Sequence, residues 1–185
     1  MDELLKNTKP PLKIVVGAGG VFEPGWIPTE IDVLNLLKPD DWRRYFTPGS
    51  LDAILAEHVW EHLTLPQGTA AAQTCFKYLK PGGYVRAAVP DGLHPDAAYI
   101  EWVRPGGVGP GADDHKVLFT YKTFADMFRR VGFMVKVLEY FDENGAFNHL
   151  PWSAAEGLIH RSKEFDRRNQ GGGLKYTSII LDATK

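Results

Sequence analysis

Two histidines and two glutamates fall in one short segment, Glu57-His58-Val59-Trp60-Glu61-His62. The spacing H-x-x-E-H is the inverted zinc-hydrolase signature, in which two imidazoles on one helix face bind the metal. The other interpretation places these residues at the mouth of a different cofactor's pocket. A zinc site would need a further carboxylate and a water on one rigid face. Because no second metal-like cluster is evident, we expect no metal site.

A glycine turn, Gly17-Ala18-Gly19-Gly20, follows a short β-branched run at 12–16. In an open α/β sheet, ligands bind beyond the carboxyl ends of the strands, where backbone has to approach the ligand closely. We therefore expect Gly17, Ala18 and Gly19 to line a cofactor site. The alternative is an ordinary tight turn, since short glycine motifs often match by accident.

The turn does not fit a dinucleotide fingerprint. Phe22 stands where the third glycine belongs, and Pro24, Gly25 and Pro28 leave little room for a helix. Without a helix N-terminus a pyrophosphate loses its cluster of amides and a favourable dipole. Phosphate-bearing cofactors are therefore disfavoured.

A nucleoside cofactor without phosphate needs the glycine turn and a carboxylate that accepts hydrogen bonds from the ribose hydroxyls. Glu30, near the expected end of a second strand, can supply that carboxylate. Asp32 is the substitute if the strand register differs by two, because both side chains would then lie on the same face.

The periodicity predicts alternating strands and helices, which indicates an α/β parallel sheet covered on both faces. Pro28 requires an edge position or a break in strand pairing. We expect the segment after the third strand to be helical until Pro66 and Gly68 end it. Two long Pro- and Gly-containing connections, 92–116 and 142–173, are candidate lids or substrate loops. The predicted strands are 12–16, 26–33, 51–56, 84–89, 133–140 and 176–182, and the predicted helices are 69–80 and 121–131.

The composition indicates one soluble globular domain over residues 1–185, with cytoplasmic location as the default. A net charge of -2 gives no field that would gather nucleic acid, and no apolar stretch approaches a membrane span. We interpret Arg167 and Arg168 as part of a solvated helix face. Cys75, the one cysteine, is expected to be a small buried apolar residue rather than a nucleophile.

Taken together, these motifs resemble class I S-adenosylmethionine-dependent methyltransferases, and within them a small branch of uncharacterised substrate. The resemblance covers most of the chain. The most specific stretch is a helix ending in Leu-Lys-Pro-Gly-Gly before a strand. The matching segments are 15–20, 29–31, 51–63, 76–86, His115, 139–142 and 178–183.

The resemblance implies a Rossmann-like methyltransferase fold, with a mostly parallel sheet and helices on both faces, abbreviated after the first strand. It implies S-adenosylmethionine as cofactor, with Glu57 and His58 beside its methionine portion. Phe22 or Trp26 would cover part of the cofactor, or would belong to the core.

The expected function is methyl transfer to a small molecule, such as a saccharide or other surface-polymer precursor. Asp91 and His115 are the candidate bases, although Asp91 could equally cap a turn and His115 could fasten a loop. His149 and Trp152 are candidates for the substrate side. The alternatives are a cofactor-binding protein without catalysis, and the zinc hydrolase.

Overall fold

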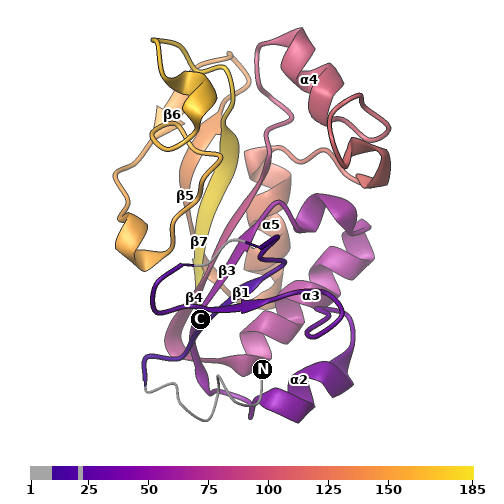
Figure 1. Ribbon diagram of the computed structural model, residues 1–185, viewed down its shortest axis with the longest axis vertical. Coiled ribbons are helices and arrows are strands. Elements are labelled where there is room, and N and C mark those ends of the chain that lie inside the picture. Colours follow the sequence, from indigo (N-terminus) through magenta and orange to yellow (C-terminus); the bar gives the residue numbers. More distant parts are fainter. Residues whose placement is uncertain (1–9, 21–22) are drawn as a thin grey trace.

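The computed structural model describes residues 10–20 and 23–185, which form a twisted sheet with helices against it (Figure 1). The described part holds a seven-stranded sheet in the order β2-β1-β3-β4-β7-β5-β6. The strands are β1 (Lys13–Val16), β2 (Ile27–Thr29), β3 (Leu51–Glu57), β4 (Leu79–Pro90), β5 (Met134–Phe141), β6 (Phe147–His149) and β7 (Ser178–Thr184).

The strand directions confirm the expected α/β fold. β2, β1, β3 and β4 are mutually parallel, and β7 lies antiparallel between β4 and β5. β5 therefore points the same way as β4, and β6 runs antiparallel to β5. The carboxyl ends of β1, β2, β3 and β4 consequently meet at one edge of the sheet, which is where an α/β fold binds ligands.

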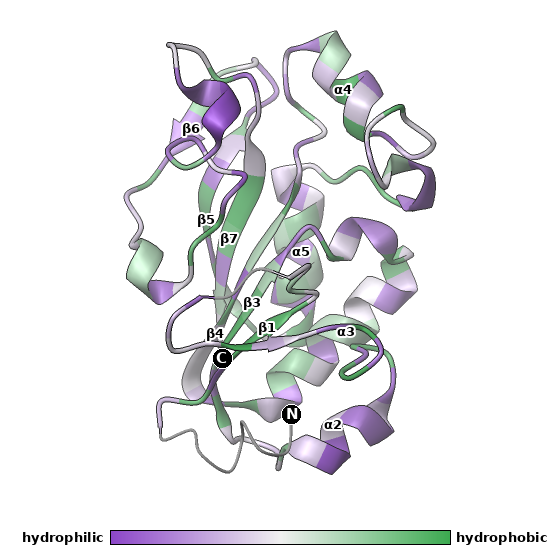
Figure 2. Ribbon diagram, in the orientation of Figure 1, coloured by the Kyte–Doolittle hydropathy of each residue, from purple (hydrophilic) through white to green (hydrophobic). Residues whose placement is uncertain are grey.

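One face of the sheet carries most of the apolar core. Residues alternate between the faces, so that Ile14 and Ile54 lie in this core while Val15 and Leu55 lie in a cluster on the opposite face. Three helices supply buried side chains to it: α2 (Pro39–Tyr45), α3 (Leu65–Tyr78) and α5 (Tyr121–Val131). Figure 2 shows the resulting hydrophobic colour along β3 and β7.

The opposite face has a different cover from the helices that we expected on both sides. Within the described residues, Trp152 and Ile159 pack there, on either side of the 3₁₀ turn η3 (Ala154–Glu156). The fully buried Arg86 binds this covering segment to the sheet. Its guanidinium donates to the Asp182 carboxylate and to two carbonyls of the connection, those of Ser153 and Gly157, because a buried charge requires such partners.

The prediction that Pro66 ends a helix was wrong, because α3 begins at Leu65 with Pro66 in its first turn. Proline costs little there, since its missing N–H would have had no helical partner. The Thr64 and Gln67 side chains form a capping box at this end. The predicted 69–80 helix therefore starts earlier and stops at Tyr78.

Other predictions agree closely with the structure. α5 has the expected bounds and ends at Gly132, whose φ of 113° few other residues adopt. β2 is shorter than predicted, and Pro28 lies in it at the edge of the sheet, as expected. Cys75 is buried. Residues 17–20 and 23–26 contain no helix, in keeping with a fold abbreviated after β1.

The two long connections contain short elements. Residues 92–116 include α4 (Ala97–Val103) and the 3₁₀ turn η2 (Ala112–Asp114). Residues 142–173 include β6, η3 and the 3₁₀ turn η4 (Arg167–Asn169). In the part of the chain that the structure describes, no helix has the length and apolar character to cross a membrane.

Candidate functional site

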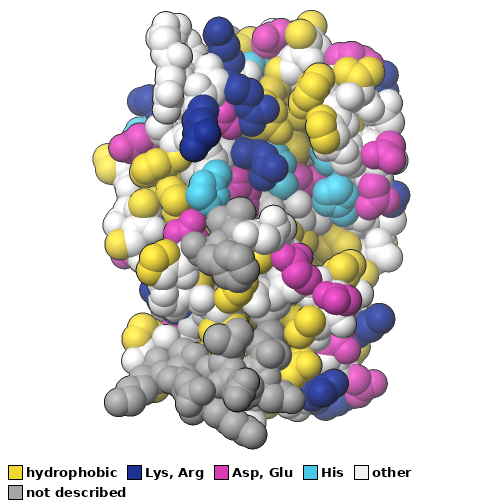
Figure 3. All heavy atoms as spheres, viewed as in Figure 1, with side chains coloured by type: hydrophobic (Ala, Val, Ile, Leu, Met, Phe, Trp, Pro, Cys, Tyr) yellow, Lys and Arg dark blue, Asp and Glu magenta, His cyan; other side chains and the backbone are white. Residues whose placement is uncertain are grey.

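A cavity of about 650 Å³ opens where β1 and β3 end. Its wall comes from the glycine turn after β1, from 57–62 after β3, from His115, and from several residues of 158–168. Figure 3 shows histidine side chains (cyan) close to Lys and Arg side chains (dark blue) on the face in view. Six of the predicted site residues line the cavity, namely Gly17, Ala18, Gly19, Glu57, His58 and His115.

The glycine turn is held in a conformation that suits glycine. Gly17 and Gly19 have φ values of 63° and 58°, in the left-handed region. A Cβ on Gly17 would lie 2.9 Å from Cγ2 of Val59, so the turn passes very close to the segment after β3. The Ala18 N–H donates to the Thr29 carbonyl at 3.0 Å, which fixes the turn to the end of β2.

Glu30 and Asp32 do not line this cavity among the described residues. Glu30 follows β2 directly, and its Oε1 accepts a hydrogen bond from the N–H of Gly20 at 3.2 Å. The side chain of Glu30 therefore reaches the glycine turn. Its other carboxylate oxygen, Oε2, has no hydrogen-bond partner among the described residues. Asp32 lies in the turn beyond the strand and is exposed, so the two carboxylates do not share a strand face as supposed.

Glu57 faces the cavity but also joins two parts of its wall. Its carboxylate accepts hydrogen bonds from the backbone N–H groups of His160, at 3.0 Å, and Arg161, at 2.8 Å. The end of β3 is thereby fastened to the connection that leads to β7.

His58 lies in a turn and not in a helix. Its φ is 55°, and the residues after it form the 3₁₀ turn η1 (Trp60–His62). The expectation that His58 and His62 share a helix face was therefore wrong. His58 Nε2 lies 2.9 Å from the Ser178 hydroxyl oxygen, and its Nδ1 lies 3.1 Å from Glu61 Oε1. Both ring nitrogens of His58 therefore have partners within the protein.

Asp91 has a structural position and not the cleft position that we expected of a base. It is fully buried and absent from the cavity wall. Its two carboxylate oxygens accept the N–H groups of Leu93, at 2.9 Å, and Phe141, at 2.7 Å. Burial raises the pKa of this carboxyl to about 6, although the two N–H donors oppose the rise. Asp91 thus connects the end of β4 to the end of β5.

His115, the other candidate base, does reach the cavity. Its Nδ1 lies 2.7 Å from the carbonyl oxygen of Val103. A carbonyl only accepts, so Nδ1 carries the proton and the lone pair of the neutral ring is on Nε2. His115 therefore both fastens a loop and keeps a nitrogen free for chemistry.

Comparisons with known proteins address the fold. No family model matches the sequence, and no curated protein does. Among solved structures, a SAM-dependent methyltransferase from Archaeoglobus fulgidus superposes with a TM-score of 0.57 at 14% identity, covering 100% of this chain and 90% of that one. Another, from Mesorhizobium loti, has a TM-score of 0.50 at 15% identity, covering 99% and 96%. PigF, in a structure with SAH, has a TM-score of 0.52 at 7% identity, covering 100% and 60%.

The chain has the fold of the S-adenosylmethionine-dependent methyltransferases. At these identities the likeness concerns the fold alone, and it agrees with the resemblance noted in the sequence motifs. Within this methyltransferase fold, the cavity lies at the ends of β1 and β3, beside the glycine turn.

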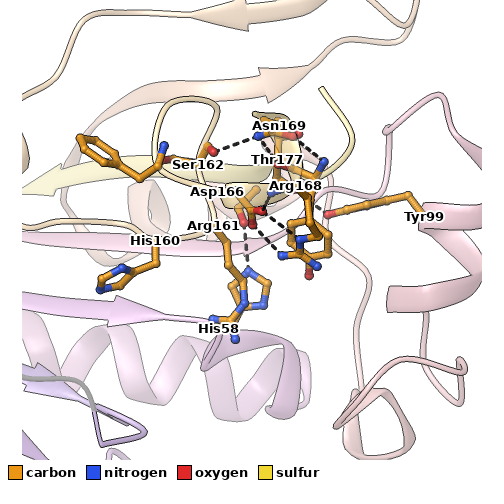
Figure 4. A network of polar contacts seen from close by, with 12 residues as sticks. His58, Tyr99, His160, Arg161, Ser162, Asp166, Arg168, Asn169 and Thr177 are labelled. Carbon is orange, nitrogen blue, oxygen red and sulfur yellow. Dashed lines mark hydrogen bonds and ion pairs between the residues drawn. The ribbon is translucent and has the colours of Figure 1, made fainter. Parts of the chain in front are cut away.

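The methyltransferase fold also brings in residues that the sequence motifs did not single out. We interpreted Arg168 as part of a solvated helix face, but it lines the cavity from a 3₁₀ turn. Its guanidinium donates to the Asp166 carboxylate at 2.6 Å and lies 3.4 Å from the centre of the Tyr176 ring. Arg161 and His160 also line the cavity, and Figure 4 shows these side chains gathered near His58. The only signal in the sequence was the length of the connection that carries them.

Three further candidates lie outside the cavity wall. Trp152 Nε1 donates to the buried carboxylate of Glu139, and His149 Nε2 lies 3.8 Å from the same group. Trp26 packs in the apolar cluster on the opposite face of the sheet, as expected if it is a core residue and not a cover for the cofactor. Phe22 lies outside the described residues.

Proposed function

We propose that this chain transfers a methyl group from S-adenosylmethionine to a polar small molecule. The observation that carries the proposal is the joint wall that Gly17–Gly19 and Glu57–His58 form around one cavity at the strand ends. Its volume of about 650 Å³ lies within the range of small-molecule sites. The fold and the structure of PigF with SAH support the choice of cofactor.

The parts of the cofactor have complementary neighbours in this proposal. The open side of the glycine turn accepts the adenosine, because a Cβ on Gly19 would have no neighbour within 4 Å. Glu30, which already reaches the N–H of Gly20, offers its second oxygen to the ribose hydroxyls. The negative charge of Glu57 attracts the cationic methionine portion.

The reaction requires alignment more than special chemistry from the protein. A lone pair of the acceptor attacks the methyl carbon, and the carbon–sulfur bond breaks with its electron pair staying on sulfur. The neutral thioether leaves, and an oxygen acceptor gives up its proton to water. Holding the two reactants in line supplies ~7–11 kcal/mol in favourable cases. His115 lines the cavity and is the group that we expect to face the acceptor.

The chemistry of the wall favours a polar acceptor. Histidines, glutamates and arginines dominate the side facing the glycine turn, and the aromatic residue among the lining side chains is Phe165. Charged and imidazole groups pair with hydroxyl, carboxylate or phosphate groups. A saccharide or another surface-polymer precursor has such groups.

Isothermal titration calorimetry with S-adenosylmethionine and with S-adenosylhomocysteine tests the cofactor. We expect one site per chain for each compound, and no detectable binding of either would overturn the proposal. Release of S-adenosylhomocysteine across a panel of saccharide and nucleotide-sugar acceptors tests catalysis. Binding without turnover on any acceptor would instead favour a cofactor-binding protein without catalysis.

A further inference from the structure

Three potential metal ligands meet at the wall of the cavity. Glu61, His62 and His115 each offer one ligand atom, and these atoms all lie within 4.8 Å of one another. All three residues line the cavity. The cluster differs from the H-x-x-E-H interpretation, because it takes its second histidine from a distant loop and leaves out His58.

A backbone contact places the distant histidine. The N–H of Lys116 donates to the carbonyl of Glu61 at 2.7 Å, so the loop that carries His115 is fastened to the turn that carries Glu61 and His62. The two imidazole rings consequently lie edge to face, with their centres 4.8 Å apart.

Both imidazoles are oriented through their Nδ1 atoms. His62 Nδ1 lies 3.2 Å from Asp114 Oδ2, and His115 Nδ1 lies 2.7 Å from the Val103 carbonyl. Since both partners only accept, each Nδ1 carries a proton and each Nε2 carries the lone pair. Metal-binding histidines characteristically donate their other ring N–H to a carboxylate or a carbonyl in this way.

Glu61 adds a negative charge that the protein itself does not neutralise well. Its side chain is 1% exposed, and neither carboxylate oxygen accepts a hydrogen bond from the described residues. The ion-pair contact that the structure describes for it is His58 Nδ1, 3.1 Å from Oε1. Burying a carboxylate without such partners is costly, and a bound cation removes that cost.

The donor set selects the kind of ion. Two imidazoles and one carboxylate suit zinc, iron, cobalt, nickel or manganese, whereas calcium and magnesium prefer oxygen ligands alone. Around an ion with bonds of about 2.1 Å, neighbouring donors lie roughly 3–3.4 Å apart. Because the three donors lie within 4.8 Å of one another, no pair has to close by more than about 1.4–1.8 Å to reach that spacing.

We propose that Glu61, His62 and His115 bind one divalent transition-metal ion at the wall of the cavity, with Asp114 and Val103 as the outer partners that orient the imidazoles. Three protein ligands leave coordination positions open toward the cavity. An acceptor oxygen would bind there, and the cation would hold it and favour loss of its proton to water. This role for the ion rests on the proposed methyltransferase function, whereas the metal site does not.

Cobalt binding tests the site without any assay of activity. The purified chain is treated with chelator, dialysed and titrated with Co²⁺, which is followed by its visible absorption, and Zn²⁺ then competes for the site. We expect one ion per chain. His62→Ala and His115→Ala should abolish this binding, and Asp114→Asn should weaken it by ~10–100-fold. His149→Ala is the matched control, because His149 lies outside the cluster and should leave binding unchanged.

Two results would overturn the metal site. One is the absence of stoichiometric Co²⁺ binding to the wild-type chain. The other is unchanged binding in both histidine variants. Circular dichroism of each variant shows whether it is folded, and Glu61→Gln, which keeps the size of the buried side chain, serves if an alanine variant unfolds. The metal-free chain is also titrated with S-adenosylmethionine. A failure of the cofactor proposal would appear in that titration, whereas a failure of the metal site would appear in the Co²⁺ titration.

Discussion

Glu57 and Arg161 are 104 positions apart in the chain, yet the N–H of Arg161 donates to Glu57 Oε1 at 2.8 Å. The neighbouring N–H, of His160, donates to the other carboxylate oxygen at 3.0 Å. One carboxylate at the end of β3 therefore holds the connection that closes the far wall of the cavity. Glu57 thereby adds to the contacts that Arg86 makes with the Ser153 and Gly157 carbonyls of the same connection.

We expect Glu57→Ala to release this wall. Loss of two hydrogen bonds to a charged acceptor should lower the free energy of unfolding by about 2–4 kcal/mol. Hydrogen exchange followed by mass spectrometry should show faster exchange in the peptide that contains His160 and Arg161. Glu164→Ala, an exposed change in the same connection, is the control. Unchanged protection of that peptide in Glu57→Ala would contradict the fastening role.

Glu30 and Asp32 can be distinguished by paired substitutions. Glu30 reaches the glycine turn through the N–H of Gly20, whereas Asp32 is exposed in the turn beyond β2. We expect Glu30→Ala to weaken binding of S-adenosylmethionine by ~1–3 kcal/mol, the cost of losing a hydrogen-bonding partner. Asp32→Ala should bind like the wild type in calorimetry. Weaker binding by Asp32→Ala than by Glu30→Ala would contradict this prediction and would indicate that Asp32 binds the ribose.

The two glycines of the turn separate backbone strain from steric contact. Gly17→Ala and Gly19→Ala both place a side chain at a positive φ, which costs about 1–2 kcal/mol. Only the first also brings Cβ within 2.9 Å of Val59 Cγ2, whereas Cβ at Gly19 meets nothing within 4 Å. Thermal unfolding should therefore show the larger loss for Gly17→Ala. Equal losses of stability in the two variants would mean that Val59 moves aside at no cost and that the contact with Cβ is not restrictive.

Asp91 should affect stability and not cofactor binding. Asp91→Asn keeps the size of the side chain but can accept only one of the two N–H groups, from Leu93 and Phe141. At pH 4, where the carboxyl is protonated and both side chains are neutral, we expect a loss of about 1–3 kcal/mol in the free energy of unfolding. Calorimetry with S-adenosylmethionine should give the wild-type affinity. Lost turnover with full stability would instead restore Asp91 as a base.

The same residue predicts a pH dependence with a definite sign. Burial raises the pKa of Asp91 in the folded chain to about 6, from a usual value of 3.8. A group with a raised pKa contributes stability that is complete below about pH 4 and is lost as the pH rises through about 6. The stability advantage of the wild type over Asp91→Asn should therefore shrink by roughly 3 kcal/mol between pH 4 and pH 7. Urea unfolding across that interval measures it, and a constant difference would show that Asp91 does not titrate there.

Local signals in the sequence account for the predictions that agree with the structure. α5 was predicted with its observed bounds from its amphipathic spacing and from Gly132, which takes a left-handed conformation at its end. Both signals act within a few residues. Pro66 shows the limit of such signals. Proline either ends a helix or occupies its first turn, and the choice depended on the capping box of Thr64 and Gln67.

By itself, the sequence determined the α/β order of elements, the glycine turn after the first strand, and the acidic and imidazole groups at the strand ends. Only the tertiary structure decided the partners of those groups. In the sequence, Asp91 and His115 were equal candidates for the base. In the structure, Asp91 accepts a backbone N–H of β5 in the interior, whereas His115 lies beside Glu61 and His62 at the cavity. Periodicity is a property of neighbouring residues, whereas these contacts depend on how strands and loops pack across distances that no local pattern encodes.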